Sequence, residues 1–135
     1  MKMEFDIVPS TEKDNDAIHE MLRAYNRRFM SGFKDYSCHI ADAGKIVAGI
    51  VAGSVFDTLE VEFLFVDEKY RGRGLGKGLI KHVEELAARD GLKRVLLNTY
   101  SFQAPDFYRA LGYRQLLEIS PCFGDFSQYY FMKQL

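Results

Sequence analysis

The feature that most constrains the fold is the glycine-rich stretch VDEKYRGRGLGKGLI at residues 66–80. It follows the apolar run LEVEFLFV and precedes a periodic apolar stripe, so it predicts a turn between a buried strand and a helix. Four glycines between positions 72 and 78 disfavour a helix unless they are compensated. Glycine lets a ligand approach the backbone, and the first amides of a helix carry partial positive charge. We therefore interpret the stretch as an anion site that suits phosphate, rather than as a helix start with solvated basic residues.

Two common nucleotide-binding motifs are excluded at this turn. A Walker A loop requires Gly five places before the Gly of Gly-Lys-Ser/Thr, but Arg71 stands there and Gly78 follows Lys77. A dinucleotide fingerprint requires Gly or Ala at Lys77 or at Leu79, depending on its register, and neither is present. A nucleotide-binding protein stays the alternative interpretation, and stabilisation of the chain by ATP would indicate it.

Hydrophobic periodicity predicts a mixed α and β chain. Phe5, Ile7 and Pro9 alternate with Asp6 and Val8, which predicts a short edge strand at 5–9. Thr11 with Asp14 can form a capping box for a helix over about 14–28. Strands interrupted by helices, with hairpins in the middle, predict a mixed sheet covered by helices on its faces. The other expected elements are an ordered connector at 29–34, three antiparallel strands within 36–66, a helix over 74–90, a strand at 94–100, a short helix at 105–111, and strands at 113–119 and 128–134.

Composition bounds the class of protein. A chain of 135 residues with 47% hydrophobic residues has the size of one domain, so we expect a single domain over residues 1–135. A net charge of −1 gives no general field for a polyanion, so no nucleic-acid partner is expected. Cys38 and Cys122 lack partners at ligand spacing, which predicts reduced thiols and no metal. The charged N-terminus and the lack of a run of roughly 18 apolar residues predict a cytoplasmic protein without a membrane partner.

A family resemblance adds to this interpretation. Residues 71–76, Arg-Gly-Arg-Gly-Leu-Gly, resemble the Arg/Gln-x-x-Gly-x-Gly/Ala motif of the GNAT superfamily of acetyl-CoA-dependent N-acetyltransferases. Asn98, Ala104 and the block Phe-Tyr-Arg-Ala-Leu-Gly-Tyr at 107–113 are similar to the second conserved block of that family, and residues 99–113 resemble a subgroup of small bacterial members. The resemblance implies an α+β fold with a mixed, mostly antiparallel sheet of about six or seven strands flanked by helices. In that fold the fourth and fifth strands splay apart around the pantetheine arm.

The resemblance implies acetyl-CoA as co-substrate. Backbone amides of residues 71–77 would hold the pyrophosphate, with the basic side chains in this segment adding charge. The backbone of Phe65 and Val66 would meet the pantetheine amides like an added strand. Asn98 would bind the pantetheine or a bridging water, the alternative being an ordinary polar residue at a strand end. The expected cofactor-binding residues are Phe65, Val66, Arg71, Gly72, Arg73, Gly74, Leu75, Gly76, Lys77, Asn98 and Tyr108.

Acyl transfer requires a base and an acid. An alkyl ammonium with a pKa of about 10.4 is protonated near neutral pH and must lose a proton before it attacks a thioester. Glu60 and Glu62 share one strand face, so either of them or a water chain can take that proton, and we prefer Glu60. By resemblance, Tyr108 is the acid that protonates the leaving thiolate. The alternatives are a solvated polar face for the two glutamates and simple packing for Tyr108.

The acceptor site is predicted from aromatic residues. Tyr25, Phe29 and Phe33 lie between the first helix and the second strand, which in this family form one wall of the acceptor cleft. Phe126 belongs to the other wall, and an aromatic cleft with carboxylates can hold a cationic amine. The alternative is that these rings pack the sheet edge or a dimer interface. The second wall also contains Phe123, Asp125 and Tyr129.

Together these observations predict an N-acetyltransferase that moves an acetyl group from acetyl-CoA to a primary amine by direct attack in a ternary complex. The expected partner is a small-molecule or peptide amine, and a homodimer rests only on the pairing common in the family. Asn98, Tyr108 and the two glutamates argue against the competing interpretation, a non-catalytic acyl-CoA-binding regulatory module. A covalent route through Cys122 lacks a base to activate the thiol.

Overall fold

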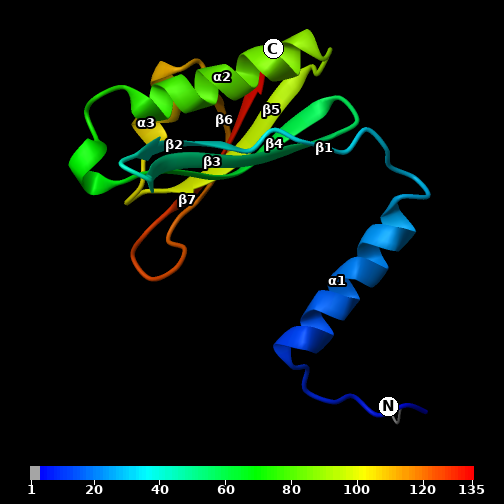
Figure 1. The fold of residues 1–135 in the computed structure, drawn as a ribbon. Helices are drawn as coiled ribbons and strands as arrows, with labels where there is room; N and C mark the ends of the chain where they lie inside the picture. Colours follow the sequence, from blue (N-terminus) through cyan, green and yellow to red (C-terminus); the bar gives the residue numbers. More distant parts are fainter. Residues whose placement is uncertain (1–3) are drawn as a thin grey trace. The chain divides into compact units, whose positions relative to one another are not determined.

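The structure is a computed structural model that describes residues 4–135. Its backbone forms two units, residues 4–31 and Gly32–Leu135 (Figure 1). The first unit contains helix α1 (Glu12–Asn26), and the second contains a seven-stranded sheet with helices α2 and α3. The sheet of the second unit is therefore the framework on which a site can be built.

Helix α1 begins at the capping box that the sequence predicts. The Thr11 amide donates to Asp14 Oδ2 at 2.9 Å, and the Asp14 amide donates to Thr11 Oγ1 at 3.2 Å. The first of these bonds stabilises the carboxylate and lowers the pKa of Asp14. Because Thr11 is the capping residue itself, α1 starts directly after it and covers Glu12–Asn26 rather than the predicted 14–28.

The edge strand predicted at residues 5–9 is wrong. Residues 6–11 have no regular secondary structure, and the side chains of Phe5, Ile7 and Val8 are 77%, 81% and 73% exposed. Alternation of apolar and polar residues produces a strand only where a neighbouring strand supplies hydrogen bonds. No described strand pairs with this segment.

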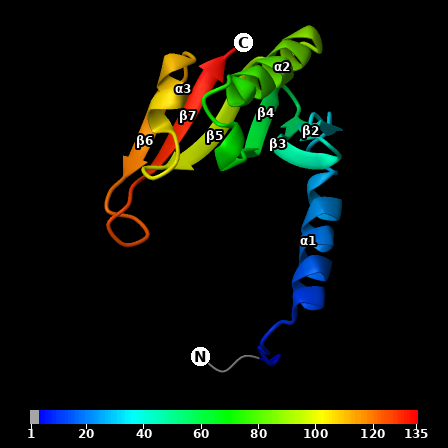
Figure 2. The same cartoon turned by 60° about the vertical axis from the view of Figure 1, so that its left-hand side comes forward.

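The sheet is mixed and mostly antiparallel, as predicted (Figure 2). Its strands lie in the order β1-β3-β4-β5-β7-β6, with β2 also paired to β3, and only β4 and β5 are parallel. The predicted strands and helices after residue 36 are all present, whereas β1 was not predicted: it begins at Lys34, the last residue of the predicted connector. The elements are β1 (Lys34–Asp35), β2 (Cys38–Asp42), β3 (Lys45–Val55), β4 (Thr58–Val66), the 3-10 helix η1 (Glu68–Tyr70), α2 (Leu75–Arg89), β5 (Arg94–Tyr100), α3 (Pro105–Ala110), β6 (Arg114–Ile119) and β7 (Gln128–Gln134).

One hydrophobic core joins α2 and α3 to one face of this sheet, which we call the inner face. In α2, Leu79, Ile80, Val83 and Ala87 recur at helical spacing and are at most 5% exposed. They pack with alternate residues of β3, β4, β5 and β7, and Tyr108 of α3 belongs to the same core. Because side chains alternate along a strand, the intervening residues lie on the opposite, outer face of the sheet.

A buried polar cluster ties α2 to the segment after α3 and to β7. The Tyr113 hydroxyl donates to Glu84 Oε2 at 2.6 Å, and Lys133 Nζ lies 3.0 Å from Glu84 Oε1. Burial, reinforced by the bond to Glu84, raises the pKa of Tyr113. The phenol therefore stays protonated and keeps donating to a carboxylate that is itself only 8% exposed.

Replacing Tyr113 by Phe should lower the free energy of unfolding by about 2 kcal/mol, because one oxygen of a buried carboxylate loses its donor. Above about pH 10 the unfolded wild-type chain ionises at Tyr113 while the folded chain does not, so the stability difference should shrink as the pH rises. Urea unfolding followed by circular dichroism at neutral and alkaline pH measures both effects. Tyr130→Phe, at a side chain that is 36% exposed, is the control, and an equal loss in the two variants would contradict the role given to Glu84.

Candidate active site

The sheet opens between β4 and β5. The two strands pair from Thr58 and Arg94 only as far as Val61 and Leu97, and Figure 2 shows them diverging toward their carboxyl ends. Beyond Val61, residues 63–66 pair with β3 on one edge, and within residues 4–135 no strand pairs with their other edge. This open edge presents backbone N–H and C=O groups to which an extended ligand with amide groups can bind.

A β-bulge marks the point where the strands separate. Val51 of β3 pairs with Phe63 and Ala52 pairs with Val61, which leaves Glu62 as the extra residue of β4. A bulge bends its strand and increases the local twist. The bulge at Glu62 therefore accounts for the departure of β4 from β5 one residue after their last pair.

The glycine turn lies at the end of β4, where α2 begins. Gly72 and Gly74 have φ angles of 79° and 80°, so both occupy the left-handed region that other residues rarely adopt. A Cβ atom at either position would meet nothing within 4 Å, so the backbone there is open to a ligand. Gly74 is the N-cap of α2 and provides no side-chain cap, so the first amides of the helix lack the partner that a capping residue supplies. The turn thus combines uncapped N–H groups, the positive end of a helix dipole and free approach.

Gly76 connects this turn to α3. A Cβ atom on Gly76 would lie 3.5 Å from Val66 Cγ2 and 3.7 Å from Phe107 Cζ. The first turn of α2, the end of β4 and α3 therefore meet at this glycine. Leu75, the preceding residue, packs against the core and fixes the start of the helix.

The two arginines of the turn differ in their contacts. Arg71 Nε donates to the carbonyl of Val66 at 3.0 Å, and its guanidinium lies 5.9 Å from the Phe65 ring centroid. Arg73 stacks over Tyr70 at 5.1 Å. Arg71 is thus held against β4, where its remaining N–H groups can serve an anion, and the Val66 carbonyl already has a donor.

Tyr108 has a buried ring and an accessible hydroxyl. Its ring is packed by Phe107, Tyr113 and Phe131, with centroids 5.1, 5.6 and 6.1 Å away, and the residue is 7% exposed. Among residues 4–135 the hydroxyl makes no protein hydrogen bond, yet no side-chain oxygen is both fully buried and unpartnered, so the hydroxyl must reach solvent. Burial raises the pKa of Tyr108 to about 12. The site therefore holds a neutral phenol with a free donor.

The predicted polar residues of the strands share the outer face. Glu60, Glu62 and Asn98 are all exposed, while their neighbours Leu59, Val61 and Leu97 point into the core. Glu60 pairs with Leu96 of β5 in the parallel register, and the amide of Gln128 donates to Asn98 Oδ1 at 3.4 Å. The glutamates and Asn98 thus flank the line along which β4 and β5 part.

The predicted acceptor residues fall in both units. Tyr25 and Phe29 belong to the first unit, where their ring centroids lie 5.4 Å apart. Phe33 and Phe126 belong to the second unit and are 55% and 46% exposed. Phe126 contacts Phe102, a residue that the sequence interpretation did not select because it lies in a loop with no periodic pattern.

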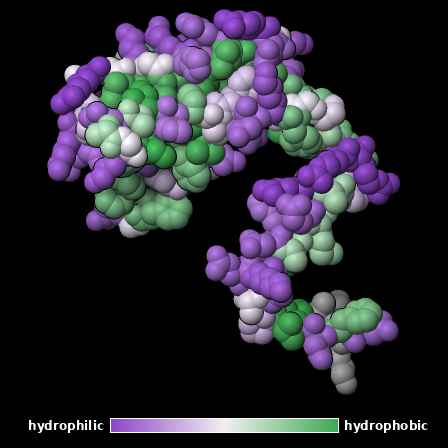
Figure 3. Space-filling model, in the orientation of Figure 1, coloured by the Kyte–Doolittle hydropathy of each residue, from purple (hydrophilic) through white to green (hydrophobic). Residues whose placement is uncertain are grey.

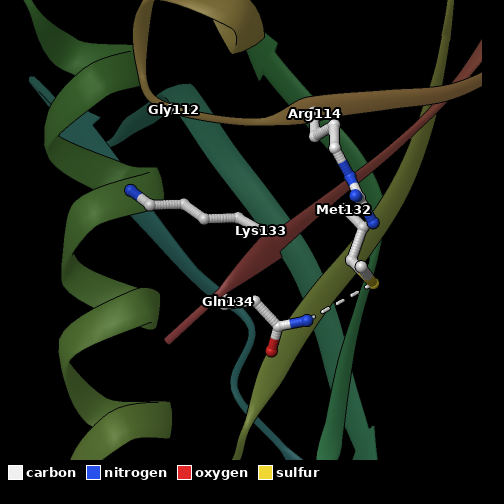
Figure 4. A pocket seen from close by; sticks show the side chains of 5 residues that line it. All are labelled: Gly112, Arg114, Met132, Lys133 and Gln134. Atoms are coloured by element: carbon white, nitrogen blue, oxygen red, sulfur yellow. Dashed lines mark hydrogen bonds between the residues drawn. The ribbon is translucent and has the colours of Figure 1, made fainter.

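Two pockets lie beside the sheet, one far from the glycine turn and one that includes Gly78, the last glycine of the glycine-rich stretch. One is at the other end of the sheet, beside the first residue of β5, and Figure 4 shows its Lys133 side chain extending toward α2. The other lies between β2 and α2 and contains Cys38, which is not in a disulfide, with His39 and His82. Within residues 4–135 no three or more His, Cys, Asp or Glu side chains gather in a way that could hold a metal ion. The first pocket is lined by Gly112, Arg114, Met132, Lys133 and Gln134.

Comparison with known proteins identifies the family. The sequence model described as "Acetyltransferase (GNAT) family" matches residues 4–113. The chain belongs to this GNAT family of acetyltransferases. The match includes both the glycine turn and the block at residues 107–113, so the resemblance stated from the sequence is confirmed.

Relatives and solved structures agree with this assignment. The blasticidin-S acetyltransferase of Streptomyces morookaense is 33% identical over 114 residues, which cover 79% of this chain and 82% of that protein. The crystal structure of an acetyltransferase from Bacillus cereus is 30% identical, with a TM-score of 0.81 over 97% of this chain and 98% of that one. An acetyltransferase of Bacillus anthracis in complex with acetyl coenzyme A shares the fold at 19% identity, with a TM-score of 0.66 over 81% of this chain and 67% of that one.

This GNAT protein is therefore an N-acetyltransferase whose acetyl donor is acetyl-CoA and whose acceptor carries an amine. The structure fits such a donor at three points: the uncapped start of α2, the open space beside Gly72 and Gly74, and the unpaired edge of β4. A phosphate group suits the first two and an amide-bearing arm suits the third. In the described part of the chain, no helix is both long and apolar enough to cross a membrane.

Replacing Gly74 by Ala should weaken coenzyme A binding about tenfold or more, because the added methyl group strains the left-handed residue and obstructs the approach of an anion. Isothermal titration with coenzyme A measures the loss. Gly91→Ala is the matched control, since Gly91 also has a positive φ, of 85°, and open space around its Cβ position. Both variants should lose about 1 kcal/mol of stability, and weaker binding in both to the same extent would show that the effect is only structural.

Proposed function

We propose that this GNAT protein transfers the acetyl group of acetyl-CoA directly to a primary amine of a small molecule or peptide, within a ternary complex. The observation that carries the proposal is the gap between β4 and β5 beside the uncapped glycine turn. The gap gives the donor a route through the sheet, and the outer face supplies polar groups for an acceptor. Direct transfer is supported because the described site offers no activated nucleophile, Cys122 having no adjacent base.

The donor would be held mainly by backbone. The amides of residues 71–77, including the uncapped start of α2, would bind the pyrophosphate, and Arg73 and Lys77 would add charge. Phe65 and Val66 would offer the open edge of β4 to the pantetheine amides, and Asn98 would face them from β5. Gly72, Gly74 and Gly76 keep this surface free of side chains, and Leu75 anchors it to the core.

A glutamate of β4 would act as the base. Glu60 and Glu62 both lie exposed on the outer face beside the point where the strands part. The amine must lose its proton before attack, because an ordinary alkyl ammonium is protonated near neutral pH. We prefer Glu60, which sits in regular β structure, over Glu62 at the bulge, and a water molecule can relay the proton from the acceptor.

Tyr108 would act as the acid toward the leaving sulfur. Its burial keeps the hydroxyl protonated, with a pKa of about 12, and its ring is held on several sides by aromatic neighbours. A neutral donor without a protein partner can hydrogen-bond to the thiolate as the carbon–sulfur bond breaks. The reaction then balances: the amine nitrogen bonds to the acetyl carbon, the sulfur leaves, the base holds the amine proton and the sulfur gains one.

The family match begins in the first unit and extends through most of the second, which supports one N-acetyltransferase domain over residues 1–135. The relative that acetylates blasticidin S favours a small-molecule acceptor over a peptide. Of the aromatic side chains predicted for the acceptor, Phe33 and Phe126 belong to the unit that carries the other proposed residues. A homodimer is not required, since one chain supplies every proposed residue.

The direct test is release of free coenzyme A thiol from acetyl-CoA with a panel of small amines, polyamines, aminoglycosides, amino acids and peptides. At least one amine should exceed the blank without acceptor, and coenzyme A should raise the thermal midpoint in proportion to the logarithm of its concentration. A raised midpoint without turnover on any amine, oxygen or thiol acceptor would favour the non-catalytic acyl-CoA-binding module. The absence of both turnover and a raised thermal midpoint would refute the proposal.

Replacing Tyr108 by Phe should lower kcat about 100-fold while leaving the affinity for acetyl-CoA within about twofold, because only the proton donor is removed. Single-turnover acetyl transfer and titration with acetyl-CoA measure the two quantities. As the pH rises, loss of the Tyr108 proton should not lower the wild-type activity until about pH 11, because burial raises the pKa of Tyr108 to about 12. Unchanged turnover in the variant would exclude Tyr108 as the acid.

Glu60→Gln and Glu62→Gln identify the base. The variant that lacks the base should lose about 30-fold or more in kcat/KM near neutral pH and recover as the pH approaches the pKa of the amine, which is then already neutral. The pH profile of kcat/KM for both variants and the wild type measures this recovery. A loss that is independent of pH would instead indicate a binding role, and small losses in both variants would leave a water chain as the proton acceptor.

A further inference from the structure

Four aromatic rings form a cluster, one of them at the end of β5 and three in the loops that follow β5 and β6. Of the four, only Phe126 has a role in the acceptor site proposed from the sequence. Tyr100 stacks on Phe102 with centroids 5.4 Å apart and an interplanar angle of 6°. Phe123 meets Tyr100 edge-on at 5.4 Å, and Phe126 meets Phe102 edge-on at 4.7 Å. Phe102, Phe123 and Phe126 remain 59%, 66% and 46% exposed. We call these four residues the aromatic cluster.

The aromatic cluster lies at the end of the sheet where β4 and β5 part. Tyr100 is the last residue of β5, and alternation places it on the outer face together with Asn98. The remaining rings come from the β5–α3 loop and the β6–β7 loop, and hydrophobic colour gathers over the latter loop in Figure 3. The cluster is thus continuous with the face that carries Glu60 and Asn98.

Hydrogen bonds hold the two loops together. The Ser101 amide donates to the Ser127 carbonyl at 2.9 Å, and the Ser127 amide returns a bond to Ser101 Oγ at 2.9 Å. The Cys122 amide donates to the Phe126 carbonyl at 2.7 Å, which closes the tip of the β6–β7 loop. A surface whose loops are already fixed loses little conformational freedom when a ligand binds.

Phe123 has an unfavourable backbone conformation that burial of its side chain does not offset. Its φ of 60° is rare for a bulky residue. Among residues 4–135 two other non-glycine residues have positive φ, Ala43 and Phe56, and both occupy tight hairpin turns whose geometry favours positive φ. Phe123 lies in a longer loop, and its ring is left 66% exposed rather than packed into the core. Such strain at an exposed ring beside a reaction site indicates that the ring serves a ligand.

We propose that the aromatic cluster is the part of the acceptor site that stacks on a flat aromatic or heteroaromatic ring, so that the substrate is a ring-bearing amine rather than an aliphatic polyamine. This inference rests on the proposed N-acetyltransferase function. Stacking or edge-on contact between aromatic rings raises the affinity for a planar ring by roughly two- to twelvefold more than burial of its apolar surface alone. With its ring on the cluster, the substrate directs its amine along the outer face toward the β4 glutamates.

Tryptamine is a suitable probe because the chain contains no tryptophan, so its indole fluorescence reports binding directly. Titration in the presence of coenzyme A should give saturable binding to the wild type. Phe102→Leu and Phe123→Leu should each weaken that binding about fivefold. Phe56→Leu is the matched control, because Phe56 is also an exposed phenylalanine with positive φ but lies in the β3–β4 turn at the other end of the sheet, and it should leave binding unchanged.

A comparison of turnover between tryptamine, which has an aromatic ring, and 2-cyclohexylethylamine, which has a saturated ring, tests the aromatic acceptor site separately from the proposed acetyltransferase function. The wild type should prefer tryptamine in kcat/KM, and the preference should fall about fivefold in the two cluster variants. Equal turnover of both amines with no effect of either variant would overturn the aromatic acceptor site and leave the acetyltransferase proposal intact. Absence of tryptamine binding, or equal binding to the wild type and to both cluster variants, would overturn it even if no amine were acetylated. No turnover and no stabilisation by coenzyme A would overturn the proposed function itself.

Discussion

The end of the β4–β5 pairing at Val61 and Leu97 is the constraint on which the site depends. Two adjacent parallel strands would normally continue their ladder, because each unpaired backbone group must otherwise find water or a ligand. Here β4 stays paired with β3 as far as Val66, and β5 stays paired with β7 as far as Tyr100. Each wall of the gap is therefore held by its own neighbour. The gap is a stable feature of the sheet, and its open edge is available to a ligand with amide groups.

Helix α2 can begin without a cap because its apolar face fixes it elsewhere. Omitting a side-chain cap costs about 1 kcal/mol. Burying Ile80 and Val83 completely contributes roughly 2 kcal/mol for each side chain, so packing outweighs the missing cap. The uncapped amides at Gly74 and beyond are then free to bind an anion. Gly76, in contact distance of Val66 and Phe107, places this anion site beside the end of β4 and beside α3.

Most of the fold follows from local signals in the sequence. The glycine turn, the apolar stripe of α2 and the hairpin turns each fix an element within the chain itself, so their positions could be predicted. The strand expected at residues 5–9 failed because a strand also needs a partner, which its own alternation cannot supply. The short strand β1 was missed for the converse reason, since Lys34 and Asp35 have no strand pattern and are strands only through pairing with β3.

Prediction of the site from the sequence has the same limit: local motifs can be recognised, but contacts between distant segments cannot. Residues at the glycine turn could be selected because a motif and a physical argument coincide there. Phe123 and Phe126 of the aromatic cluster could also be selected, but their contacts with Tyr100 and Phe102 could not, because more than twenty positions separate the two pairs and only the loop contacts bring them together. Resemblance could name Tyr108 as an acid but could not show the depth of its burial or the consequence for its pKa.

That pKa also limits how Tyr108 can act. A phenol with a pKa of about 12 does not readily give its proton to a thiolate whose conjugate acid has an ordinary pKa of about 8.5. It donates a strong hydrogen bond first, and this bond stabilises the negative charge that develops on the sulfur. The same desolvation that keeps the phenol neutral also disfavours a free thiolate beside it, which brings the two pKa values closer together. Burial of the Tyr108 ring therefore favours the neutral phenol before the reaction and the neutral thiol after it. The aromatic packing around Tyr108 thus has a chemical as well as a structural effect.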